Sequence, residues 1–143
     1  MKNLLIILSL LLSTISVAQE EWGDVNRNTV TMKEIAPVWP GCESNNVYQR
    51  DACFDKKLMQ HIVKNFKYPV AEYKKNVQGR VVVDFIINTK GLVEIKSATG
   101  GSPGLQAEAK RNIKAIPKMK PGMLAGKPRA IKYTVPFNFK TGK

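Results

Sequence analysis

Between residues 79 and 98 the sequence carries two runs of alternating side chains, separated by a tight-turn signal. In the first run, the residues that share one face are all apolar: Val81, Val83, Phe85 and Ile87. The segment Asn88–Gly91 follows, and its glycine can take the positive φ that hairpin turns require. In the second run, Leu92, Glu94, Lys96 and Ala98 alternate with Val93, Ile95 and Ser97. The pattern predicts an antiparallel β-hairpin around which the rest of the fold is built.

Amphipathic helices are predicted on both sides of this hairpin. Upstream, Asp51 is the expected N-cap of a helix with an apolar stripe at Phe54, Leu58, Ile62 and Phe66, widened by Met59 and Val63. Tyr68-Pro69 ends this helix, and a short second helix is expected through Lys75. Downstream, Ser102 caps a helix whose stripe is Leu105, Ala109, Ile113 and Ile116. The elements together predict an α+β fold.

Alternation returns over residues 129–139, and this last strand contains a proline. One face carries Ile131, Tyr133, Val135, Phe137 and Phe139. Pro136, on the other face, has no N–H to give to a ladder, so the strand is expected at a sheet edge or at a bulge. An open edge favours aggregation unless another chain is meant to pair with it. The strand is therefore a candidate site for a partner.

The first 18 residues have the features of a secretory signal. Lys2 gives a positive start, Leu4–Leu12 is apolar apart from one serine, and Ser16–Ala18 has the small-x-small pattern that signal peptidase reads. The apolar segment is shorter than the roughly 20 residues of a spanning helix. We expect a signal peptide at residues 1–18, a flexible leader at 19–36, a domain at 37–143 and a periplasmic location; an uncleaved inner-membrane anchor stays the alternative.

Charge is unevenly distributed along the chain. The formal net charge is +12, with −4 over residues 19–55 and +15 over residues 56–143. A basic domain invites a nucleic-acid interpretation, but export makes DNA or RNA an improbable partner. Acidic surfaces and polymers of the cell envelope remain possible partners.

The chain contains only two cysteines and one histidine. Cys42 and Cys53 are the two cysteines, and in an oxidising compartment such a pair favours a disulfide. The competing interpretations are two free thiols, or a metal pair with His61, which would leave a structural zinc set incomplete. No nucleophile–base set or carboxylate pair is visible, so His61 is expected to be a packing or surface residue, and we expect no enzyme activity, metal or cofactor.

From Trp39 onward the chain resembles the C-terminal domain of TonB-type energy transducers, particularly the variety common in Bacteroidetes. The resemblance rests on segments in matching order: Asn65–Pro69, Gln78–Val83, Asn88–Gly91, Gly104–Leu105, Glu108–Ala109, Ile116–Gly122, Gly126–Pro128 and Tyr133–Phe137. Met119 stands where many relatives have tryptophan. The leader of about twenty residues, which would extend to roughly 70 Å, is short beside the Pro-rich spacer of a complete transducer.

The resemblance implies a small antiparallel sheet packed on two main helices. It also implies a function, because members of the family bind the TonB box of outer-membrane receptors as a strand added to an open sheet edge. The expected partner-binding residues are Arg80, Arg129, Lys132, Tyr133, Thr134, Val135 and Phe137. Motor proteins, peptidoglycan or another anionic wall polymer, and a second copy of the chain are further possible partners.

Overall fold

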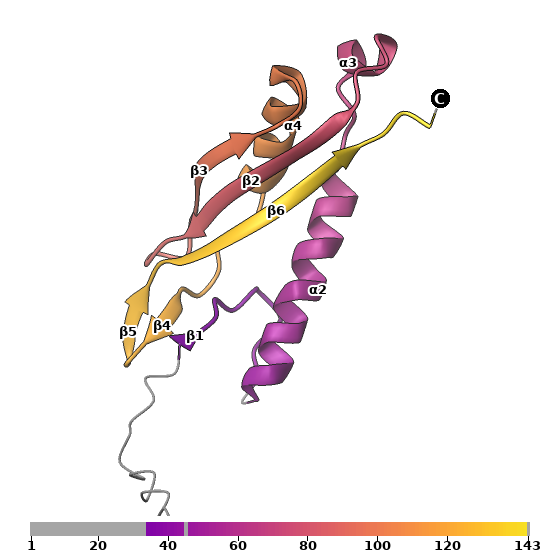
Figure 1. The fold of residues 1–143 in the computed structure, drawn as a ribbon. Coiled ribbons are helices and arrows are strands. Elements are labelled where there is room, and N and C mark those ends of the chain that lie inside the picture. Colours follow the sequence, from indigo (N-terminus) through magenta and orange to yellow (C-terminus); the bar gives the residue numbers. More distant parts are fainter. Residues whose placement is uncertain (1–33, 45, 143) are drawn as a thin grey trace, which may run out of the picture. The chain divides into compact units, whose positions relative to one another are not determined.

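The computed structural model describes residues 34–44 and 46–142 (Figure 1). Its main sheet is antiparallel, with β2 (Gly79–Ile87) between β3 (Val93–Thr99) and β6 (Ile131–Phe139). Two helices, α2 (Val47–Asn65) and α4 (Pro103–Lys114), pack on one face of this sheet. The predicted α+β fold, with its hairpin, two main helices and C-terminal edge strand, is confirmed.

The buried core lies between that face of the sheet and the two helices. The predicted inner faces of β2 and β6 are correct, because the alternation of burial follows the alternation of apolar residues. From α4 the predicted stripe also points inward, and from α2 the Phe54 ring stacks on Tyr133 with ring centroids 5.0 Å apart. The buried apolar residues of α2, β2, α4 and β6 are Phe54, Val81, Val83, Phe85, Ile87, Leu105, Ala109, Ile113, Val135, Phe137 and Phe139.

The second half of the hairpin departs from simple alternation. Asp84 pairs with Ser97 but Phe85 pairs with Ile95, so Lys96 is an extra residue on β3. This β-bulge exchanges the faces beyond it. Ala98, rather than Ser97, packs against the core, and the predicted assignment of these two residues is wrong.

Helix α2 begins earlier than predicted. Asn46, not Asp51, is the N-cap, and its side chain accepts hydrogen bonds from the amides of Tyr48 and Gln49. Met59 and Val63 do not widen the buried stripe: their exposed fractions are 62% and 69%. They lie on a side of α2 that the rest of the described chain leaves open.

The hairpin turn is formed as predicted and also holds a distant loop. The side chain of Asn88 accepts hydrogen bonds from the amides of Lys90 and Leu92, and Gly91 has a φ of +77°. The amide of Met119 donates to the carbonyl of Gly91 at 3.0 Å. A Cβ at Gly91 would lie 1.7 Å from the Met119 carbonyl oxygen, so this approach also requires glycine.

A second small sheet and a disulfide hold the N-terminal part of the domain. The remaining elements are β1 (Glu34–Ile35), α3 (Val70–Lys74), β4 (Gly122–Leu124) and β5 (Lys127–Arg129). β4 pairs with both β1 and β5, so residues 34–35, assigned above to the leader, belong to the packed domain. Cys42 and Cys53 form the expected disulfide.

The expected signal peptide and the leader up to residue 33 lie outside the described residues. Within residues 34–44 and 46–142, no helix has both the length and the apolar character to span a membrane.

Candidate functional site

The outer edge of β6 presents main-chain groups that do not pair within the main sheet. The amide of Asn88 donates to the carbonyl of Leu92 at 2.8 Å, so the even-numbered residues of β2 direct their main-chain groups toward β3 and the odd-numbered ones toward β6. Because β2 and β6 pair residue for residue, the odd-numbered residues of β6 bond to β2. The main-chain groups of Lys132, Thr134, Pro136 and Asn138 therefore point to the open side, as the proline predicts.

Two of the expected contact residues, Lys132 and Thr134, meet on the solvent face of the sheet around Asp84. The Thr134 hydroxyl donates to Asp84 Oδ1 at 2.5 Å, and Lys132 Nζ lies 3.4 Å from Oδ2. The Thr134 hydrogen bond, followed by the charge of Lys132, lowers the pKa of the Asp84 carboxyl below its ordinary value. These contacts fix two side chains directly beside the open edge.

The other expected residues of β6 point into the protein. Val135 and Phe137 are buried, and the Tyr133 ring stacks on Phe54 and on Phe85. Burial, together with nearby carboxylates, raises the pKa of the Tyr133 phenol, so the phenol stays neutral. The main-chain groups of these three residues bond to β2 and their side chains are committed mainly to the core, so they are not positioned to bind a partner at the open edge.

The two expected arginines do not form one site. Arg80 is opposite Asn138 near one end of β6, whereas Arg129 ends β5, just before the other end of β6 at Ile131. A strand rises about 3.3 Å per residue, so roughly 25 Å separates the two ends of β6. Each arginine is exposed, and at this separation the two side chains cannot bind the same charged group.

A groove that the sequence analysis missed runs between this edge and α2. It has a volume of about 310 Å³ and is lined by Ile62, Val63, Phe66, Pro136, Phe137 and Asn138. Figure 1 shows α2 alongside β6, the strand that ends the sheet. One feature of the sequence could have indicated this groove. Met59 and Val63 lie beside the main apolar stripe of the helix, at positions that the core need not cover. The groove places apolar side chains next to unpaired main-chain groups.

His61 connects the two main helices and is not part of this groove lining. Its Nε2 lies 3.0 Å from the carbonyl oxygen of Asn112, and its ring centroid lies 5.9 Å from that of Trp39. The amide group of Asn112, fully buried, donates to the carbonyl of Ile62 at 3.0 Å. The histidine therefore has a packing position, as expected.

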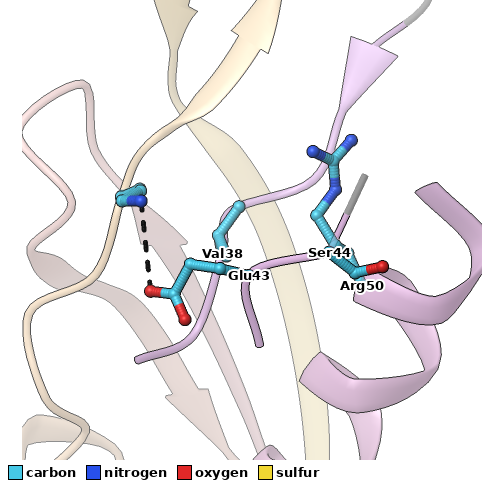
Figure 2. A pocket seen from close by; sticks show the side chains of 5 residues that line it. Val38, Glu43, Ser44 and Arg50 are labelled. Carbon is cyan, nitrogen blue, oxygen red and sulfur yellow. Dashed lines mark ion pairs between the residues drawn. The ribbon is translucent and has the colours of Figure 1, made fainter. Parts of the chain in front are cut away.

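A more polar pocket of about 370 Å³ lies near the start of α2 (Figure 2). Lys120 Nζ is 4.0 Å from Glu43 Oε1, and the picture shows the Arg50 side chain directed away from this pair. Val38 and Ser44 complete its lining. Among the described residues, three or more His, Cys, Asp or Glu side chains nowhere gather as a possible metal site.

Comparisons with known proteins found similar solved structures. Two NMR solution structures of the Helicobacter pylori TonB C-terminal domain are similar to the chain: one has 21% identity and a TM-score of 0.44 over 63% of this chain and 96% of the other. The second has 19% identity and a TM-score of 0.44 over 61% and 79%, respectively. No curated protein matches.

The sequence pattern of the family described as Gram-negative bacterial TonB protein C-terminal matches residues 64–141. This range is more than half of the chain and contains β2, β3, α4 and β6. The chain belongs to the TonB C-terminal domain family.

Proposed function

We propose that this domain is a non-catalytic binding module that takes up the TonB-box segment of an outer-membrane receptor as an additional strand beside β6. Its family implies a role in TonB-dependent energy transduction. The observation that supports this binding mode is the open edge of β6, where alternate residues carry main-chain groups without a partner strand in the main sheet. Backbone hydrogen bonds supply the affinity of such an added strand.

The proposed setting is the periplasm, after removal of residues 1–18. The features that support it are the signal-like N-terminus and the disulfide, which is typical of oxidising compartments. Sequencing the N-terminus of the protein purified from its native envelope tests this setting. A chain that starts at Gln19 is expected, and a membrane-bound chain that starts at Met1 would instead support an anchored transducer.

NMR titration tests the binding mode. A synthetic TonB-box segment added to ¹⁵N-labelled protein is expected to shift the amide signals of Lys132, Thr134 and Asn138 first, because these amides point to the open side. Shifts confined to the first half of α2 would refute strand addition.

A proline substitution adds a sharper test of the same edge. Lys132→Pro removes an outward amide without removing a bond to β2, and one lost hydrogen bond should weaken binding roughly five- to tenfold. Lys132→Ala is the matched control, because it removes the same side chain but keeps the amide. Equal affinities of the two variants would contradict the proposed mode.

A further inference from the structure

The polar pocket at the start of α2 contains an arginine without a counter-charge. We propose that this pocket is a second binding site of the domain, and that it takes a carboxylate group on the guanidinium of Arg50. None of the residues that line the pocket belongs to β6. The inference therefore goes beyond the proposed function and does not depend on strand addition.

The first step of the argument is the state of Arg50. Its Nε is buried without a hydrogen-bond partner, and no ion pair within residues 34–44 and 46–142 includes this side chain. The residue as a whole is only partly buried and lines the pocket, so the terminal nitrogens remain accessible from it. Buried polar atoms in native proteins nearly always have a partner. A cation that has lost part of its hydration without gaining a counter-charge favours an anionic ligand.

The second step is the framework that fixes the walls of the pocket. The disulfide joins the residue before Glu43 to α2, about one turn after Arg50, so two of the walls are linked covalently. On another side, Val38 and Lys120 exchange main-chain hydrogen bonds of 3.0 and 3.2 Å. The pocket has a volume of about 370 Å³, which suits a small ligand or the end of a chain. A site that is already formed loses little conformational freedom when a ligand binds.

The third step is the charge of the lining. Arg50 and Lys120 are positive and Glu43 is negative, so the lining has a formal charge of +1. This charge complements a carboxylate better than a phosphate group, which carries about −1.5 to −2 near neutral pH. Figure 2 shows Glu43 and Lys120 facing each other, with Arg50 apart from them. Arg50 is thus free to hold both oxygens of a carboxylate with two parallel N–H groups, an arrangement that planar guanidinium favours.

NMR titration of the ¹⁵N-labelled full chain tests the site, because the Nε–H of Arg50 has a side-chain signal of its own. The probes are N-acetylalanine and an acetylated Gly-Gly-Ala peptide. Each is compared with its C-terminal amide, which has a similar shape but no charge. We expect each acid that enters the pocket to bind at least about tenfold more tightly than its amide, because the amide cannot form the charged hydrogen bonds.

Three variants assign the binding to the guanidinium. Arg50→Gln should weaken binding of the acid roughly tenfold. Arg50→Lys should recover only part of the loss, because an ammonium group keeps the charge but cannot make the paired contact. Lys74→Gln removes one positive charge from an exposed residue on α3, beyond the other end of α2 (Figure 1), and should leave the affinity unchanged. Thermal unfolding verifies that the variants fold.

Each outcome supports or overturns the inference. Binding of N-acetylalanine alone supports a free small acid as the occupant, and binding of the peptide supports the carboxyl end of a chain. Equal affinities for acid and amide, an unchanged affinity after Arg50→Gln, or no binding of either acid at tens of millimolar would overturn it. Inorganic phosphate that binds as tightly as the acid would overturn the choice of carboxylate. Shifts at Lys132 and Thr134 in place of Arg50 would move the binding to the β6 edge and also overturn it.

Discussion

Gly91 has a left-handed backbone conformation and also lies close to the Met119 carbonyl. A second glycine of the chain allows the energetic costs of these two features to be measured separately. Gly126 has almost the same φ, +76° against +77°, but a Cβ there would have nothing within 4 Å. We expect Gly126→Ala to lower the free energy of unfolding by about 1 kcal/mol, the cost of the left-handed conformation alone. Gly91→Ala should cost at least about 3 kcal/mol, because the Met119 loop must also move. Urea unfolding of the two variants measures the difference, and equal losses would show that the loop yields easily.

The Asp84 carboxyl gives the domain a predictable response to acid. Its pKa lies below the ordinary 3.8, so its contribution to stability is present above about pH 4 and is lost as the pH falls through the lowered pKa. Thr134→Val removes the hydroxyl donor but keeps the shape of the side chain. We expect the pKa of Asp84 to rise toward its ordinary value and the stability lost between pH 4 and lower pH to become smaller. An NMR titration of the Asp84 side-chain carbon tests this, and an unchanged pKa would contradict it.

Single-residue burial was predictable where alternation is strict, as along β2 and β6. It was not predictable at Asn112, a polar residue that is fully buried because its amide reaches the carbonyl of Ile62 on the other helix. Such a position depends on a partner 50 residues away, which local spacing cannot reveal. The same limit applies to Tyr133, whose place on the inner face was predicted but whose stacking on Phe54 was not.

The disulfide joins two elements, the segment around Trp39 and helix α2. Trp39 and Cys42 are buried, and the Trp39 ring lies 5.9 Å from Phe54 in an edge-on arrangement. We expect the double variant Cys42→Ala, Cys53→Ala to lose about 3 kcal/mol of unfolding free energy, because the unfolded chain gains the entropy of the opened loop. Urea unfolding with and without dithiothreitol measures this: the reductant should destabilise the native chain and leave the double variant unchanged. A loss below about 1 kcal/mol would contradict the expected role.

The hairpin, the α4 helix and the edge strand could be predicted because turn, cap and alternation signals agree at each of them. The Ser102 cap, for example, accepts a hydrogen bond from the amide of Leu105 as its position indicates. The bulge at Lys96 could not be predicted, since both registers leave apolar residues on the inner face. The groove was missed for a related reason: apolar residues on α2 were assigned to the core, whereas part of them lines an open surface.

At the scale of the molecule, the two sheets differ in the length of their strands and in what those strands contact. The small sheet β1–β4–β5 gathers short strands that hold the N-terminal segment, while the main sheet keeps one long strand at its edge. Long open edges tend to aggregate unless charge or a proline protects them. Pro136 and the positive charge of residues 56–143 supply both kinds of protection. We therefore expect this edge to accept an acidic strand more readily than a second copy of the positively charged domain.

That combination predicts how binding depends on salt. Positive charge spread over the domain should speed the encounter with an acidic segment, whereas main-chain hydrogen bonds and the α2 groove should determine how long it stays bound. Raising the ionic strength from about 0.01 M to 0.5 M shortens the screening length severalfold, so we expect the association rate to fall roughly tenfold and the dissociation rate to change much less. Stopped-flow fluorescence with a labelled synthetic segment that contains one aspartate measures both rates. A peptide with asparagine in place of its aspartate is the control and should associate at a rate that depends only weakly on salt; a dissociation rate that rises steeply with salt would show instead that charge, not strand pairing, holds the complex.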